Sequence, residues 1–308
     1  MQVGFVGLGR MGANMVRRLV RDGHSAIVFD LVPGAATALA EELGQGVMAA
    51  ETLADVANAL TEPRVFWMMV PQGDAVDSTI DAALAVGTHG DILIDGGNSY
   101  FKQSIERAKR VESVGMNYVD CGTSGGVWGL ERGYCLMIGT DPQTFAHCEP
   151  LFRTLAPTGG YRHVGGHGAG HFTKMVHNGI EYALMQAYAE GFEILESAER
   201  YGFEFDLAGL AELWQEGSVI RSWLLELSGR AFRRDPELSG VSGYVEDTGE
   251  GRWTVLTAIE EDVPAMAITN ALMTRFRSRQ SDSFGARVLA ALRHEFGGHG
   301  FRPTGRGQ

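Results

Sequence analysis

Three features are scarce in this chain of 308 residues: cysteine, lysine and long apolar runs. Cys121, Cys135 and Cys148 are odd in number and form neither a disulfide framework nor a Cys-x-x-Cys pair that could bind zinc. We therefore expect free thiols, a reducing compartment and no metal site. No apolar run approaches membrane-spanning length, and the chain opens directly on the strand-like QVGFVG, without a signal peptide. These absences predict a cytoplasmic protein without a membrane partner.

Lysine is represented only by Lys102, Lys109 and Lys174 among 26 basic residues. The formal net charge of −12 argues against nucleic acid as the main partner, although an acidic small molecule needs only a local cluster of cations. A lysine in an arginine-rich chain can be there because its amine can lose a proton, which arginine cannot do in practice. Chance is the alternative explanation.

The first half of the chain alternates apolar runs with helical patterns. Strands are predicted at 2–7, 25–30, 65–70, 91–96, 116–121 and 134–139. Strand and helix in alternation indicate a parallel sheet with helices on both faces. From about residue 165 only helices are predicted, at 171–200, 206–216, 221–233, 253–260, 264–279 and 283–295. The expected fold is α/β: an N-terminal Rossmann-type doubly wound sheet over 1–165, followed by an all-α domain over 166–308.

A glycine pattern follows the first predicted strand. Gly7, Gly9 and Gly12 form G-x-G-x-x-G at the start of a helix, and Asp30 ends the second strand. Such glycines permit a tight turn, the approach of a pyrophosphate and close packing of helix on strand. Asp30 can accept hydrogen bonds from a ribose 2′-hydroxyl and would repel a 2′-phosphate, so we expect NAD to be preferred over NADP. The cofactor-binding residues expected here and after the 65–70 run are Gly7, Leu8, Gly9, Arg10, Met11, Gly12, Asp30, Met69, Val70 and Pro71.

Two further polar turns follow later strands. DGGNS places Asn98 beyond the strand at 91–96, where it could touch both cofactor and substrate. GTSGG places Ser124, Gly125 and Gly126 after the strand at 116–121, where a hydroxyl and backbone N–H groups could bind a carboxylate or hydroxyl. Both segments are also ordinary turn sequences, and each is ambiguous by itself.

The segment GAGHFTKMVHNGIEY carries Lys174, His177, Asn178, Glu181 and Tyr182. At 100° per residue these five side chains lie within an arc of about 140° on one helix. A polar stripe on a buried helix faces a cleft or joins an internal hydrogen-bond network. His163, His167 and His171 lack a carboxylate at metal-binding spacing, so we expect them to belong to a glycine-rich linker.

Taken together, these motifs resemble the β-hydroxyacid dehydrogenases, with G-x-G-x-x-x-K-x-x-x-N at Gly168, Gly170, Lys174 and Asn178. KMVHNGIEY with DGGNS and GTSGG more closely resembles the decarboxylating 6-phosphogluconate dehydrogenase family in its short bacterial form. That resemblance implies Lys174 as general base and Glu181 as general acid. It implies substrate contacts from Asn98, Ser124, Gly125, Gly126, His177, Asn178, Tyr182, Arg252, Arg275, Arg293 and His299, with Asn98 also touching the cofactor.

The same resemblance implies oxidative decarboxylation of 6-phosphogluconate with NAD, or with NADP. It also implies a homodimer or homotetramer in which the C-terminal tail, with Arg293 and His299, completes a neighbour's site. Two alternatives stay open: a dehydrogenase for a small unphosphorylated 3-hydroxy acid, and a non-catalytic nucleotide-binding scaffold.

Overall fold

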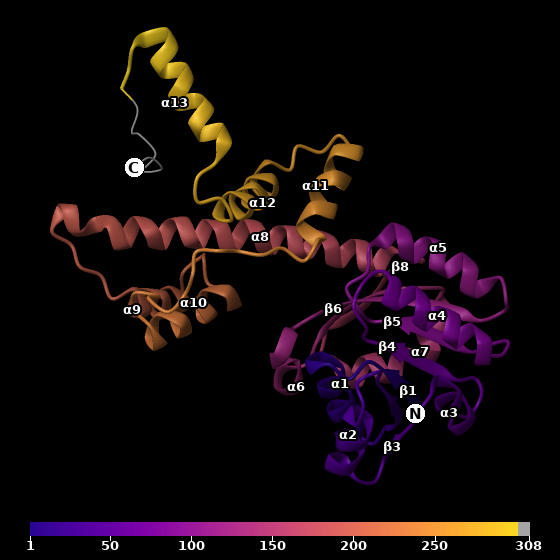
Figure 1. Cartoon of the computed structure of the whole chain (residues 1–308). Helices are drawn as coiled ribbons and strands as arrows, with labels where there is room; N and C mark the ends of the chain where they lie inside the picture. The colour runs from indigo at the N-terminus through magenta and orange to yellow at the C-terminus, as the bar shows by residue number, and fades with distance from the viewer. Residues whose placement is uncertain (301–308) are drawn as a thin grey trace. The chain divides into compact units, whose positions relative to one another are not determined.

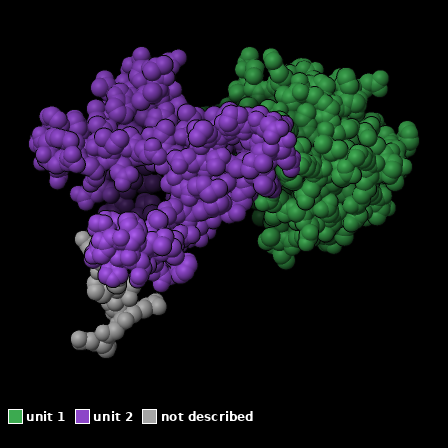
Figure 2. Space-filling view, turned by 90° about the horizontal axis from the view of Figure 1, so that it is seen from above, with its two compact units in different colours: residues 1–178 green, residues 179–308 purple. Residues whose placement is uncertain are grey.

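The computed structural model describes residues 1–300, and the chain divides into two compact units (Figure 2). Unit 1 spans residues 1–178, and unit 2 begins at Gly179. The division lies inside one long helix, α8 (Ala169–Glu196). The domain boundary that the sequence pattern places at residue 165 stays a prediction. Nowhere in residues 1–300 is a helix both long and apolar enough to cross a membrane.

The sheet of unit 1 confirms the predicted α/β class (Figure 1). Its eight strands have the order β3-β2-β1-β4-β5-β6-β7-β8. The strands are β1 (Gln2–Val6), β2 (Ser25–Phe29), β3 (Val47–Ala49), β4 (Val65–Met68), β5 (Ile92–Asp95), β6 (Asn117–Ser124), β7 (Cys135–Gly139) and β8 (Tyr161–Gly165).

Three details of this sheet were predicted wrongly. β7 runs antiparallel to β6, so the sheet is mixed rather than wholly parallel. β3 and β8 were missed because they are the two edge strands and contain no fully buried residue. β6 continues to Ser124, three residues beyond the predicted end, because its last residues pair with β7.

Helices cover both faces of the sheet, and successive strand residues separate two cores as the period of a β-strand requires. Phe5, Trp67 and Ile94 face the core that contains side chains of α1 (Arg10–Arg21), α2 (Ala35–Leu43) and α7 (Pro142–Leu155). The next residues along the strands, such as Phe66 and Leu93, face side chains of α3 (Leu53–Ala59), α4 (Asp74–Val86) and α5 (Phe101–Glu112). Both faces are therefore buried, as in a doubly wound sheet.

Residues 179–300 contain helices and no strand, so the predicted all-α character of this region is confirmed. After α8 come α9 (Leu207–Gln215), α10 (Trp223–Arg234), α11 (Glu250–Glu260), α12 (Met266–Ser278) and α13 (Phe284–Gly297). Three of these helices begin at side-chain N-caps: Asp206, Ser222 and Ser283 each accept a backbone N–H of the first turn. Such caps replace hydrogen bonds that a helix start cannot make internally.

Unit 2 has its own core where α9 and α10 pack against α8, and this core predicts a stability effect. Leu225 on α10 is fully buried there, whereas Leu213 on α9 is 62% exposed. Leu225→Ala should lower the free energy of unfolding by about 2–5 kcal/mol, because it removes buried methyl groups and leaves a cavity. Leu213→Ala should stay within about 0.5 kcal/mol of the parent. Equal losses in urea unfolding of the two variants would contradict this core.

Candidate active site

The glycine loop between β1 and α1 needs its glycines for different physical reasons. Gly7 has a φ of +91°, and a Cβ there would lie 2.5 Å from the Met69 carbonyl oxygen. A Cβ on Gly12 would overlap the Gly7 carbonyl oxygen, so this glycine permits the helix to start against the strand. A Cβ on Gly9 would meet nothing within 4 Å. The loop is therefore open at Gly9, and α1 begins beside it with Arg10 and Met11.

Asp30 follows β2 and is tied to the same loop. Its carboxylate accepts the Leu8 N–H at 2.5 Å and the Val32 N–H at 2.7 Å. The negative charge is thus held at the glycine loop, next to the open position of Gly9. This geometry fits a dinucleotide whose pyrophosphate meets backbone N–H groups at the start of α1.

The loops after β1, β4 and β5 are aligned by hydrogen bonds at the carboxyl edge of the sheet. The Met69 N–H donates to the Val6 carbonyl at 2.8 Å, and the Gly96 N–H donates to the Met68 carbonyl at 3.0 Å. The segment Met69–Pro71 therefore starts beside the glycine loop, and the DGGNS loop starts beside Met69–Pro71. Between β1 and β4 the strand order reverses, which is where open α/β sheets bind ligands.

Lys174 contacts Asn98 within unit 1, although the two residues are 76 positions apart. Its Nζ donates to Asn98 Oδ1 at 3.3 Å. The lysine reaches this edge because α8 packs very closely on β6: a Cβ on Gly122 would lie 2.5 Å from Lys174 Cβ and 2.6 Å from the Gly170 carbonyl oxygen. The structure thus brings two predicted site residues into direct contact.

Asp120 fixes the start of α8. This fully buried carboxylate of β6 accepts the Gly168 N–H at 2.7 Å and the His171 N–H at 2.9 Å. Burial raises the pKa of Asp120, while the hydrogen bonds and the positive end of the helix favour its charged form. Lys174 lies three residues beyond His171, so it belongs to a helical turn that is anchored to the sheet.

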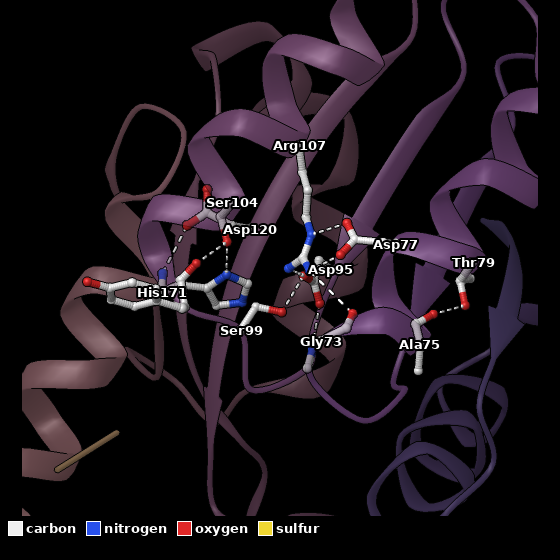
Figure 3. Close-up of polar contacts among 12 residues, drawn as sticks. Gly73, Ala75, Asp77, Thr79, Asp95, Ser99, Ser104, Arg107, Asp120 and His171 are labelled. Carbon is white, nitrogen blue, oxygen red and sulfur yellow. Dashed lines mark hydrogen bonds and ion pairs between the residues drawn. The ribbon is translucent and has the colours of Figure 1, made fainter. Parts of the chain in front are cut away.

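The three histidines are not all in a linker, contrary to the expectation. His171 is buried in α8 and its Nδ1 lies 2.7 Å from Ser104 Oγ (Figure 3). His163 is on β8, where its Nε2 contacts the Thr140 carbonyl at 2.8 Å. His167 does lie in the connection before α8. Within residues 1–300 no group of three His, Cys, Asp or Glu side chains is placed to hold a metal ion.

Other predicted site residues of unit 1 lie near the same edge. Ser124 ends β6 and is followed by Gly125 and Gly126. Their φ values of +127° and +54° are backbone conformations that residues with a side chain rarely adopt. On α8, His177 Nδ1 lies 3.0 Å from Asn178 Oδ1. The hydrogen bond orients both side chains, and both remain partly exposed.

In unit 2, the predicted residues Tyr182, Arg252 and Arg275 belong to one cluster. The Arg275 guanidinium lies 3.6 Å from the centroid of the buried Tyr182 ring. Arg252 forms two bonds to Asp247, at 2.8 and 3.0 Å, and Asp247 is also bound by Arg279 at 2.8 Å. Arginine forks of this kind suit a phosphate, and Arg275 adds a third guanidinium group to the two that bind Asp247.

Glu181, Arg293 and His299 have different positions. Glu181 is partly exposed on α8, seven residues after Lys174. Arg293 is exposed on α13, a helix with no buried residue, and the His299 carbonyl lies 3.0 Å from His294 Nδ1. No contact that the structure describes joins Arg293 or His299 to the arginine cluster, and their roles in a neighbour's site stay predictions.

Sequence reasoning missed the residues that support the site. Asp95 is part of the DGGNS motif and Asp120 lies inside the predicted strand 116–121, so each had a signal that was interpreted only as turn or strand. Asp247 and Arg279 had none: Asp247 belongs to no motif, and only folding brings Arg279 to it. Residues that only hold site residues in place do not follow a recognisable sequence motif.

Comparison with known families identifies the chain. The NAD-binding domain of 6-phosphogluconate dehydrogenase matches residues 2–165, and the C-terminal domain of 6-phosphogluconate dehydrogenase matches residues 170–295. The chain belongs to the 6-phosphogluconate dehydrogenase family. The predicted resemblance is confirmed.

Individual proteins are similar to this chain in sequence or in structure. The NAD(+)-dependent, decarboxylating enzyme of Haloferax volcanii is 44% identical over 302 residues, which cover 97% of this chain and 98% of that protein. The solved structure of Plasmodium falciparum 6-phosphogluconate dehydrogenase, determined with NADP+ and with 6-phosphogluconate, has a TM-score of 0.82 and 25% identity. It covers 100% of this chain, which matches 67% of that one. Mycobacterium tuberculosis 3-hydroxyisobutyrate dehydrogenase shares the fold, with a TM-score of 0.72, 24% identity, and coverage of 95% and 99% of the two chains.

The arginine cluster predicts a pH dependence of stability. Hydrogen bonds from Arg252 and then Arg279 lower the pKa of Asp247 from 3.8 to about 2. Because the folded-state pKa is depressed, the stabilisation by this carboxylate is present above about pH 4 and is lost as the pH falls toward 2.

Asp247→Asn should therefore be less stable than the parent near neutral pH. Its deficit in the free energy of unfolding should shrink between about pH 4 and 2, measured by urea unfolding across that range. Asp262→Asn, at an exposed position of the same unit, is the matched control. A deficit that is constant with pH would show that the ion pairs contribute nothing.

Proposed function

We propose that this protein oxidises 6-phospho-D-gluconate with NAD and releases CO2, forming D-ribulose 5-phosphate. Membership of the 6-phosphogluconate dehydrogenase family supports an oxidoreductase. The observation that carries the choice of substrate is the clustering of Arg252 and Arg275 around Tyr182 and Asp247. A small unphosphorylated acid would not need several guanidinium groups at one point.

Lys174 is proposed as the general base. It accepts the proton of the C3 hydroxyl, while bound nicotinamide supplies the hydride acceptor. The resulting protonated amine then stabilises the oxygen that becomes negative when the 3-keto acid loses CO2. The hydrogen bond from Lys174 Nζ to Asn98 Oδ1 supports this role, because it directs the amine at the carboxyl edge of the sheet.

Glu181 is proposed as the general acid that protonates C1 of the enediol. It lies on the same continuous helix as Lys174, seven residues or about 10 Å along the axis. C1 and C3 of the substrate are only two bonds apart, so the long side chains of Lys174 and Glu181 would converge on that end of the substrate. Between them on α8, His177 and Asn178 would bind substrate hydroxyls.

The remaining substrate contacts are assigned by chemical type. Ser124, Gly125 and Gly126 would offer a hydroxyl and backbone N–H groups to the substrate carboxylate. Tyr182, Arg252 and Arg275 would bind the phosphate. Residues 1–165 would act as the dinucleotide-binding domain and residues from 166 onward as the substrate and oligomerisation domain.

A second copy of the chain is proposed to complete the site. α13 leaves Phe284, Leu289 and Phe296 at least 66% exposed and has no buried residue of its own. Exposed apolar area of this extent is typical of a surface that a partner covers. A homodimer or homotetramer in which Arg293 and His299 reach a neighbour's phosphate site would account for it.

Turnover of 6-phosphogluconate is the direct test. Purified protein with NAD and 6-phosphogluconate should reduce NAD and release CO2 in equal amounts, measured by absorbance and by trapped CO2. Lys174→Ala should lower kcat by at least about a thousandfold while the Kd for NAD changes little. Absence of turnover with either NAD or NADP would refute the assignment. Reduction of NAD by unphosphorylated 3-hydroxy acids alone would favour the alternative dehydrogenase.

Cofactor preference tests the role of Asp30. The carboxylate should accept ribose hydroxyls and repel a 2′-phosphate, so the parent should have the higher kcat/KM with NAD. Asp30→Asn removes the charge but retains an oxygen for the Leu8 N–H or the Val32 N–H. The ratio of kcat/KM for NAD to that for NADP should fall about tenfold or more. An unchanged ratio would show that the charge does not select the cofactor.

A further inference from the structure

Asp95 lies at the end of β5 and is fully buried directly before the loop that carries Asn98. Its Oδ1 accepts the Gly97 N–H at 3.1 Å, and its Oδ2 accepts the Ser99 hydroxyl at 2.7 Å. Both chain neighbours of Asn98 are therefore bound to one carboxylate. Ser99 is itself only 3% exposed, so water does not compete for this bond.

The carboxylate of Asp95 is contacted from two other elements, β6 and α5. The Tyr118 hydroxyl of β6 donates to Oδ2 at 3.2 Å, and Arg107 Nη1 of α5 lies 4.0 Å from the same oxygen. Arg107 is held in turn by two bonds of 2.8 Å to Asp77 on α4 (Figure 3). Burial raises the pKa of Tyr118 well above its ordinary value, so the phenol remains a donor. A buried charge with this many partners has a narrow range of positions.

The loop that Asp95 holds carries Asn98, which contacts the lysine. Asn98 Oδ1 accepts the Lys174 N–H at 3.3 Å, and the helix of Lys174 is anchored separately by Asp120. The two sides of the contact are thus fixed by two different buried carboxylates. On the Asn98 side, Asp95 is the only anchor that bonds both flanking residues among the contacts that the structure describes.

We propose that Asp95 and Ser99 are positioning residues for the base Lys174, acting through Asn98. This inference deepens the proposed dehydrogenase function. Neither residue touches the reacting atoms. By holding the amide oxygen of Asn98 in place, they direct one N–H of the lysine amine, and hence the lone pair that accepts the substrate proton. Loosening the loop misdirects the amine, and a small misplacement of a base lowers kcat more than KM.

Two variants separate positioning from general stability. Ser99→Ala and Tyr118→Phe each remove one hydroxyl that bonds Asp95 Oδ2, but only Ser99 belongs to the loop of Asn98. Ser99→Ala should lower kcat for 6-phosphogluconate about tenfold with little change in KM. Tyr118→Phe should leave kcat within about twofold. Equal losses in both variants, or no loss in Ser99→Ala, would overturn the proposal.

A double-mutant cycle tests the route through Asn98. In an Asn98→Ala background, Ser99→Ala should lower kcat by less than about twofold further, because the group it positions is gone. A further loss that equals the loss in the parent background would show that Ser99 acts by another route.

A measurement without substrate keeps this inference separate from the proposed function. The rate at which an amine-reactive acylating reagent modifies Lys174 is followed across pH by mass spectrometry, with Lys102 and Lys109 as internal references. Ser99→Ala should change the Lys174 rate about threefold or more relative to the references, whereas Tyr118→Phe should not. An unchanged rate overturns the positioning role. A changed rate in a protein that does not oxidise 6-phosphogluconate refutes the proposed function alone.

Discussion

The close approach of α8 to the sheet is the constraint on which the rest of unit 1 depends. A Cβ on Gly170 would overlap the carbonyl oxygens of Asp120 and Met137, and one on Gly122 would press on the stem of Lys174. Without side chains at these two positions, the helix starts in contact with β6 and β7. Close packing leaves the start of α8 little freedom to shift against the sheet. The backbone position of Lys174, four residues after Gly170, is therefore fixed by this packing.

Two buried carboxylates convert this contact into a defined geometry. Asp120 binds backbone N–H groups at the start of α8, and Asp95 binds both neighbours of Asn98. A buried charge is costly unless it is fully hydrogen-bonded, so each carboxylate stabilises only the arrangement that satisfies it. Lys174 and Asn98 then meet at an edge that also carries the glycine loop. The positions of Lys174 and Asn98 therefore rest on two buried carboxylates, Asp120 and Asp95.

Unit 2 uses charge in a different way. Arg252 and Arg279 share Asp247, and Arg275 stacks on Tyr182, so the guanidinium groups are oriented before any ligand arrives. Arginine loses less freedom than lysine on binding an oxyanion when its fork is already held. The cluster retains a positive excess while its members are fixed by protein partners. Such an arrangement supports the proposed phosphate site.

The sequence by itself determined the α/β class, the helical second half, the glycine loop and the residues of the polar stripe, because each follows from local period or spacing. It could not determine the edge strands β3 and β8 or the antiparallel direction of β7, because these depend on which strands pair. Nor could it determine the burial of His171, which depends on how α8 packs. Only the tertiary structure brought Asn98 to Lys174, and Arg279 to Asp247. Partners far apart in the chain leave no periodic signal, and their distances are set by packing alone.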